Sequence, residues 1–102
     1  MIVKLYQFLV NDKKEFVLSK QLLRSGTSIG ANIREAEQAE SKTDFIHKMS
    51  ISLKEANESE YWIELLYRAN YLDENQFIII TKELREILKL LTSIIKTSKN
   101  NK

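Results

Sequence analysis

The chain has 102 residues, of which 43% are hydrophobic and 29% charged, and its formal net charge is +2. These values are typical of a soluble globular protein organised as one domain, 1–102, and they exclude a largely disordered chain. Cysteine is absent, which excludes disulfides and thiolate metal sites. A net charge this small does not by itself indicate a polyanionic partner.

No segment of the sequence is typical of a signal peptide or a membrane span. Polar residues interrupt the N-terminal stretch before Asn11 and Asp12, whereas a signal peptide needs an apolar core and a cleavage site. No apolar run approaches the ~20 residues that a membrane span requires. We therefore expect a cytoplasmic protein without membrane association.

Helices are the default expectation because the chain contains two glycines and no proline. Three pairs of residues fit helix N-caps, in which a side-chain oxygen accepts backbone N–H bonds and a later residue reaches back. These pairs are Asp12 with Glu15, Ser41 with Asp44, and Asp73 with Gln76. They predict an all-α, antiparallel up-down four-helix bundle with helices at about 2–11, 13–39, 43–71 and 74–97.

The first predicted helix is short. Ile2, Leu5 and Leu9 form a core stripe, but ten residues span only ~15 Å against ~40 Å for the later helices. Half of the bundle would therefore lack a fourth helix. Either an oligomeric partner covers the gap, or the natural first helix is longer than the one given.

The segment 13–39 has apolar residues at helical spacing: Leu18, Leu22, Ile29, Ile33 and Ala36. Two glycines border that stripe, and each costs a helix about 1 kcal/mol relative to alanine. We expect Gly26 and Gly30 to mark the close approach of a neighbouring helix. A phosphate-binding loop is the alternative, but the segment has no following lysine and no preceding strand.

Basic residues lie on the other side of the same segment. Lys13, Lys20 and Arg24 align there and Arg34 lies nearby, which makes them candidate contacts for RNA or DNA phosphates. Three nearby glutamates dilute this charge, and no aromatic residue is interleaved for base stacking. A solvated helix face is the competing interpretation.

The segment 43–71 is apolar on two sides. One face has the pattern of an ordinary bundle helix: Phe45, Met49, Ser52, Ala56, Ser59, Ile63, Leu66 and Tyr67. A second set lies roughly opposite: Ile51, Tyr61, Trp62, Leu65, Ala69 and Leu72. A helix that is apolar on two sides must be buried on both, so the second set predicts an oligomer interface. Scattered surface aromatics are the alternative.

The last segment, 74–97, is a conventional amphipathic helix. Its apolar face consists of Phe77, Ile80, Leu84, Ile87, Leu88, Leu91, Ile94 and Ile95. Basic residues lie on the far side: Lys82, Arg85, Lys89 and Lys96. This pattern continues in helical period, so it favours a helix over a strand for the isoleucine run 78–80.

Residues for catalysis are few. His47 is the single histidine, and Asp44 with His47 offers one copy of the carboxylate-x-x-His motif, whereas di-iron bundles need two copies. Ser25, Thr27 and Ser28 have no base at a suitable spacing. We therefore expect neither an enzyme nor a metal or cofactor, and no small-molecule substrate.

One stretch carries a family resemblance. Residues 23–36 read Leu-Arg-Ser-Gly-Thr-Ser-Ile-Gly-Ala-Asn-Ile-Arg-Glu-Ala, close to the pattern R-(S/A)-x-x-S-I-x-x-N-I-x-E. Residues 44–49 and 55–62 match the third-helix pattern of the same family. The chain thus resembles the small four-helix-bundle proteins encoded within intervening sequences of bacterial 23S ribosomal RNA genes.

The resemblance implies a homopentameric bundle of unassigned biochemical role. Together with the two-sided segment 43–71, it leads us to expect a non-enzymatic scaffold in contact with RNA or DNA. It also implies kinship with the accessory variability protein of diversity-generating retroelements, so the alternative is a basic nucleic-acid-binding factor that assists a reverse transcriptase-like partner. The signature positions are Arg24, Ser28, Asn32 and Glu35. Asn32 and Glu35 would pin helix ends or subunits, and Arg24 would form an interface pair or contact a phosphate.

Overall fold

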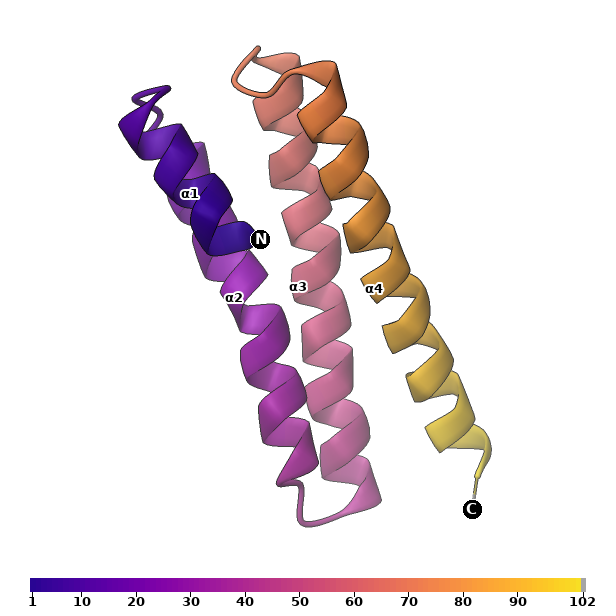
Figure 1. The fold of residues 1–102 in the computed structure, drawn as a ribbon. Helices are drawn as coiled ribbons and strands as arrows, with labels where there is room; N and C mark the ends of the chain where they lie inside the picture. Colours follow the sequence, from indigo (N-terminus) through magenta and orange to yellow (C-terminus); the bar gives the residue numbers. More distant parts are fainter. Residues whose placement is uncertain (102) are drawn as a thin grey trace.

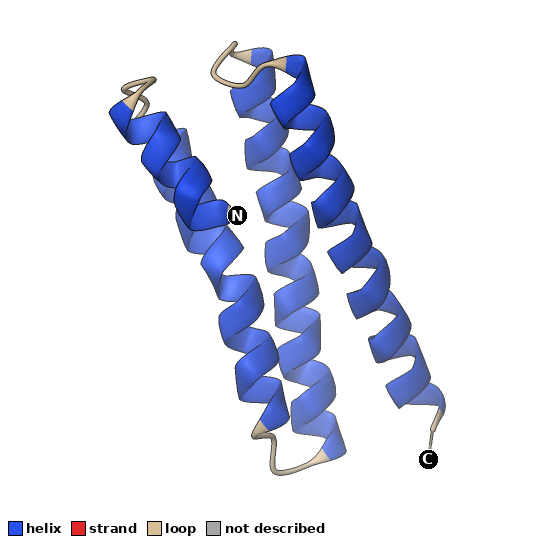
Figure 2. Cartoon of the chain, viewed as in Figure 1, coloured by secondary structure: helices blue, strands red, loops and turns tan. Residues whose placement is uncertain are grey.

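The computed structural model describes residues 1–101, which form four helices and no strand (Figures 1 and 2). The helices are α1 (Ile2–Asn11), α2 (Leu18–Glu37), α3 (Lys42–Arg68) and α4 (Glu74–Asn100). The described chain is elongated, with extents of 49 × 21 × 16 Å. The prediction of an all-helical fold with a short first helix is confirmed.

The helices pack in chain order. Contacts join α1 to α2, α2 to α3, and α3 to α4, whereas α1 and α4 do not touch through their backbones. Neighbouring helices run in opposite directions, and the N-terminus lies about midway along the bundle (Figure 1). The helix α1 therefore covers only one half of the bundle, the half that contains the α1–α2 and α3–α4 connections.

The core follows the predicted apolar stripes. Fourteen hydrophobic residues are buried: Leu5, Leu9, Leu22, Ile29, Ala36, Met49, Ala56, Ile63, Leu66, Leu72, Ile80, Leu84, Leu91 and Ile95. Aromatic residues join α3 to α4 near the α3–α4 connection, where the Tyr67 and Phe77 rings stack with their centroids 4.1 Å apart. Burial of this apolar surface is the main term that stabilises the fold.

Two of the three predicted caps are confirmed. The Ser41 hydroxyl accepts a bond from the backbone N–H of Asp44 at the start of α3. At the start of α4, Asp73 and Gln76 form a reciprocal capping box, with distances of 2.7 and 2.9 Å. Both caps satisfy donors that a helix start would otherwise leave unpaired.

The third cap was predicted wrongly, because Asp12 ends α1 and α2 begins only at Leu18. Lys14 has a φ of 54°, and this left-handed backbone breaks the helical path. Glu15 supplies the cap: its carboxylate accepts backbone N–H bonds from Val17, Leu18 and Ser19 at 2.7–2.8 Å.

Small hydroxyl side chains line the contact between α2 and α3. Ser25, Ser52 and Ser59 at this contact are completely buried. Ser19 is also completely buried, but its hydroxyl donates locally to the Glu15 carbonyl at 2.7 Å. The Ser25 and Ser59 hydroxyls lie 2.8 Å apart across the two helices, and the Ser52 hydroxyl donates to the carbonyl of Ile29 at 2.8 Å. Small residues allow close helix approach, and these cross-helix bonds satisfy the buried hydroxyls.

The two glycines differ in their surroundings. A Cβ atom built on Gly26 would lie 2.8 Å from Cγ2 of Ile2, so α1 approaches α2 closely there. A Cβ atom on Gly30 would meet nothing within 4 Å. The prediction of close approach is therefore right for Gly26 and wrong for Gly30, because α1 begins at Ile2 and does not extend to Gly30.

Candidate nucleic-acid and subunit interfaces

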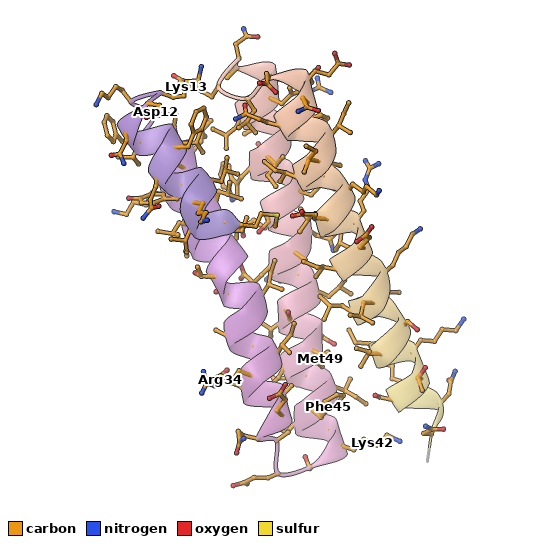
Figure 3. The ribbon with its side chains drawn as sticks, in the orientation of Figure 1. Asp12, Lys13, Arg34, Lys42, Phe45 and Met49 are labelled. Carbon is orange, nitrogen blue, oxygen red and sulfur yellow. The ribbon has the colours of Figure 1, made fainter. Side chains whose placement is uncertain are left out.

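The four basic residues predicted as phosphate contacts do not form one compact patch. Lys13 lies in the α1–α2 connection, with its ammonium 5.9 Å from the centre of the Phe8 ring. Arg34 extends away from the bundle, nearer the other end of α2 (Figure 3). Lys20 and Arg34 lie on one side of α2, but their separation of fourteen positions corresponds to roughly 21 Å along the helix.

Arg24 is held by acidic side chains of the same chain. Its guanidinium pairs with the carboxylates of Glu55, at 3.2 Å, and of Glu58. The Glu58 carboxylate also accepts a bond from the indole N–H of Trp62 at 3.0 Å. Arg24 thus connects α2 to α3 within the chain, and two carboxylates oppose a phosphate at this position.

The six residues of the predicted subunit interface divide into two groups. Leu72 is only 3% exposed and lies in the core, so its assignment to an interface is corrected, and Trp62 is half-buried against the same core. Ile51, Leu65 and the exposed Tyr61 and Ala69 lie outside the core. Because α3 packs between α2 and α4, the chain itself buries part of the apolar surface that the sequence predicts for a subunit interface.

An apolar groove lies beside the N-terminal end of α1, where this helix no longer covers the bundle. The groove has a volume of about 350 Å³ and no charged residue in its lining. Its lining residues come from every helix and from the N-terminus: Met1, Ile2, Gly26, Ile29, Gly30, Ile33, Met49, Leu84, Ile87, Leu90, Leu91 and Ile94. Met1 and Leu90 are 48% and 61% exposed. This groove is the uncovered half-bundle that the short first helix predicted.

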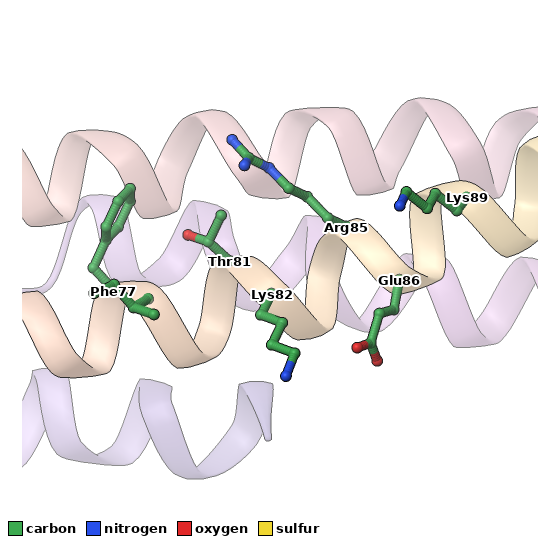
Figure 4. Close-up of a pocket in the computed structure, with 7 residues that line it drawn as sticks. Phe77, Thr81, Lys82, Arg85, Glu86 and Lys89 are labelled. Atoms are coloured by element: carbon green, nitrogen blue, oxygen red, sulfur yellow. The ribbon is translucent and has the colours of Figure 1, made fainter.

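Basic residues dominate another side of α4. A hollow of about 520 Å³ is lined by Phe77, Ile78, Thr81, Lys82, Arg85, Glu86 and Lys89. Lys82 and Glu86 extend away from α3, and Arg85 extends toward it (Figure 4). No role for these cations is predicted from the sequence, although the seven-residue spacing of Lys82, Lys89 and Lys96 is visible there.

Glu15 is a buried carboxylate whose lowered pKa is explained by its role as the cap of α2. Burial acts to raise its pKa, but the N–H groups of Ser19, Leu18 and Val17 and the hydroxyl of Ser19 together lower the pKa below its ordinary value. The charge therefore serves the start of α2. Among residues 1–101 no group of three or more His, Asp or Glu side chains is placed to hold a metal ion.

The sequence profile of the 23S rRNA-intervening sequence protein family matches residues 1–93. The chain belongs to this family. A solved structure from Bacteroides thetaiotaomicron, described as a protein with unknown function from the S23 ribosomal protein family, is 66% identical in sequence. The likeness covers 93% of this chain and 85% of that one, with a TM-score of 0.92. No curated protein matches the chain.

In this member of the 23S rRNA-intervening sequence protein family, three of the four signature residues have partners within the chain. Arg24 pairs with α3 as described, and the Lys48 ammonium of α3 lies 3.3 Å from the Glu35 carboxylate. The Asn32 side-chain amide donates to the carbonyl of Ser28 at 2.9 Å. Arg24 and Glu35 thus join α2 to α3. None of the helices in the described part of the chain has the length and hydropathy to cross a membrane.

Proposed function

We propose that the chain is a non-enzymatic subunit of a homo-oligomer, a pentamer, that acts as a scaffold in contact with RNA or DNA. The observation that carries the oligomer is the apolar groove between α2 and α4. Leu90 is 61% exposed at the groove, and Ile33, Ile87 and Ile94 are only half-buried there. A continuous apolar surface of this kind is stabilised when a second copy removes it from water.

The outer side of α3 is the competing subunit surface. Tyr61 is 55% exposed, and its ring packs edge-on against Trp62 with centroids 5.1 Å apart. However, carboxylates and Arg24 occupy the same side of α3, so this surface is more polar than the groove. Apolar residues form the centre of most subunit interfaces, and this favours the groove.

The absence of catalysis remains our expectation. Glu15 is the buried acid with a displaced pKa, and three backbone N–H groups and a neighbouring hydroxyl account for it. The proposal of contact with nucleic acid is supported by exposed basic side chains of the described surface that have no carboxylate partner.

Light scattering coupled to size-exclusion chromatography tests the oligomer. We expect a species of five times the 12.0 kDa chain mass at micromolar concentration, and a monomer would refute the proposal. Leu90→Glu and Tyr61→Glu then identify the surface, because both side chains are more than half exposed and neither change should unfold the chain. Leu90→Glu should dissociate the assembly, while Tyr61→Glu should leave it intact.

A further inference from the structure

We propose that one side of α4 binds the phosphate backbone of a nucleic-acid duplex. We define the α4 basic stripe as Lys82, Arg85, Lys89, Lys96 and Lys99. This inference rests on the nucleic-acid contact of the proposed function and names the site and the type of nucleic acid. It also moves the contact away from α2, where the sequence had placed it.

The stripe is continuous along the helix. At about 100° per residue its five cations fall within about 100° of one another. Lys82, Lys89 and Lys96 repeat every seven residues, so successive lysines are separated by roughly 10 Å along the axis, and the whole stripe extends for roughly 26 Å. A linear polyanion that lies along α4 can therefore meet several of these cations at once.

The cations of the stripe are largely free. All five residues are exposed, and among residues 1–101 the four lysines have no carboxylate within ion-pair distance. Arg85 pairs with Glu60 at 3.3 Å, but its side chain is 68% exposed and so remains accessible. On α2, by contrast, Arg24 is paired with two carboxylates. The remaining cations of that helix, Lys20 and Arg34, are far apart.

The acidic residues near the stripe lie in the N-terminal half of α4, so its C-terminal half carries only positive charge. Glu83 and Glu86 occur in its first half, and Glu86 lines the hollow beside Lys82 (Figure 4). From residue 87 to residue 101 the chain has three lysines and no acidic residue. The strongest positive potential is therefore expected around Lys89, Lys96 and Lys99.

Hollows with neutral polar groups accompany these lysines. A hollow of about 480 Å³ between α3 and α4 is lined by Leu53, Asn57, Leu88, Lys89, Thr92, Ser93 and Lys96. A further one, of about 270 Å³, is lined by Leu53, Thr92, Ile95, Lys96, Lys99 and Asn100. Hydroxyl and amide groups of this kind donate to phosphate oxygens in many nucleic-acid complexes.

The surroundings of the stripe favour a duplex over a single strand. Single-strand binders stack bases on exposed aromatic rings. No aromatic residue belongs to the stripe, and Phe77, the aromatic residue in the hollow with Lys82, is stacked on Tyr67. A basic surface without stacking groups can contact the regularly spaced phosphates of a duplex, and this binding should not depend on base sequence.

The stripe is also compatible with assembly through the apolar groove. The groove residues of α4 are Leu84, Ile87, Leu90, Leu91 and Ile94. At about 100° per residue they lie on the opposite side of the helix from Lys82, Lys89 and Lys96. A partner in the groove would leave the stripe in solvent, and a ring of subunits would repeat it.

Fluorescence anisotropy with a labelled RNA duplex and a matched DNA duplex, measured over a salt series, tests the assignment. We compare wild type with Lys89→Gln/Lys96→Gln and with the control Lys20→Gln/Arg34→Gln, which removes the same charge from exposed positions of α2. The α4 pair should weaken binding at least ~10-fold at 0.1 M salt and reduce the slope of log K against log salt by about two. The control should change affinity less than threefold.

The outcomes separate this inference from the proposed function. If wild type binds and both pairs lose affinity equally, the assignment to α4 is overturned but nucleic-acid contact stands. If wild type does not bind either duplex, the contact itself is refuted, while the oligomer is judged separately by light scattering. If polyglutamate or anionic vesicles compete as well as unlabelled duplex at equal charge, the assignment to nucleic acid is overturned.

Discussion

Glu15 shows how one side chain decides where a helix begins. The carboxylate lies beside the first turn of α2 and accepts three backbone N–H bonds, and the Ser19 hydroxyl donates back to the Glu15 carbonyl at 2.7 Å. The residue is only 6% exposed. A buried carboxylate without such donors would destabilise the fold, whereas here the N–H groups and the start of the helix both favour its charge.

Glu15→Gln should lower the free energy of unfolding by about 1–2 kcal/mol at pH 7, because the amide nitrogen replaces an acceptor with a donor. The folded state lowers the pKa of Glu15, so the carboxylate contributes stability above the ordinary glutamate pKa of about 4.3, and this contribution is lost as the pH falls through the folded value. Urea unfolding at pH 7 and pH 3 should show a difference between wild type and variant that shrinks in acid. An equal difference at both pH values would contradict the capping role.

The two helical glycines give a second prediction at this scale. Gly30→Ala should raise the free energy of unfolding by about 0.5–1 kcal/mol, since alanine favours helix and the added methyl meets no atom within 4 Å. Gly26→Ala should gain less or lose stability, because its methyl must displace Ile2. Chemical denaturation of both variants at low protein concentration measures the contrast. A larger gain at Gly26 would contradict the close approach of α1.

At the scale of elements, the serines between α2 and α3 set the distance between these helices. They combine small volume with satisfied hydroxyls, so the contact is close and also directional. Arg24 and Glu35 then join the same two helices from their surfaces through ion pairs with α3. Exposed pairs of this kind contribute little stability individually. The buried contact therefore stabilises the helix pair more than the surface charges do.

Ser52→Leu should lower the free energy of unfolding by about 1–3 kcal/mol, because the larger side chain overpacks a fully buried position and removes the bond to the Ile29 carbonyl. Ser93→Leu is the matched control on the exposed side of α4 and should change stability by less than about 0.5 kcal/mol. Thermal unfolding followed by circular dichroism measures both. Equal effects would show that the α2–α3 contact can adjust to added volume.

The start of a helix could be predicted from the sequence where the residues that cap it are close to one another in the chain. Ser41 and Asp73 have their cap partners three residues away, so both starts could be predicted closely. Asp12 has the same local pattern, but the left-handed backbone at Lys14 and the three-donor site of Glu15 shift the start to Leu18. The pattern could not reveal this, because Glu15 is placed by the end of α1, where its backbone N–H donates to the Leu9 carbonyl at 2.9 Å.

At the scale of the whole molecule, the bundle is complete at one end and open at the other. The helix α1 has close backbone contacts with α2 only, and it is attached through the buried Leu5 and Leu9 and through the contact of Ile2 with Gly26. The helix α3 packs on both α2 and α4 and forms the centre of the fold. Stability is therefore expected to be uneven along the chain.

Amide hydrogen exchange should reveal this unevenness. We expect the amides of α1 to exchange at least ~10-fold faster than the central amides of α3, because α1 is short and has close backbone contacts with one helix, whereas α3 has them with two. Mass spectrometry of exchanged wild-type protein measures the two helices in one sample, and Leu9→Ala should widen the difference, since Leu9 is fully buried. Equal protection of α1 and α3 would mean that α1 unfolds only with the whole bundle.

Residue spacing and partners within one turn were enough to predict the helical class, the core faces, two of the caps and the shortness of the first helix. The sequence also carried the signature by which the family could be identified. The tertiary structure was needed to show which charged side chains lack an ion-pair partner and which apolar residues are buried by other helices. Arg24 is occupied by Glu55 and Glu58, Leu72 is buried in the core, and the lysines of α4 remain unpaired in the described chain. These properties depend on which helices lie next to a residue, and helical periodicity alone does not identify those neighbours.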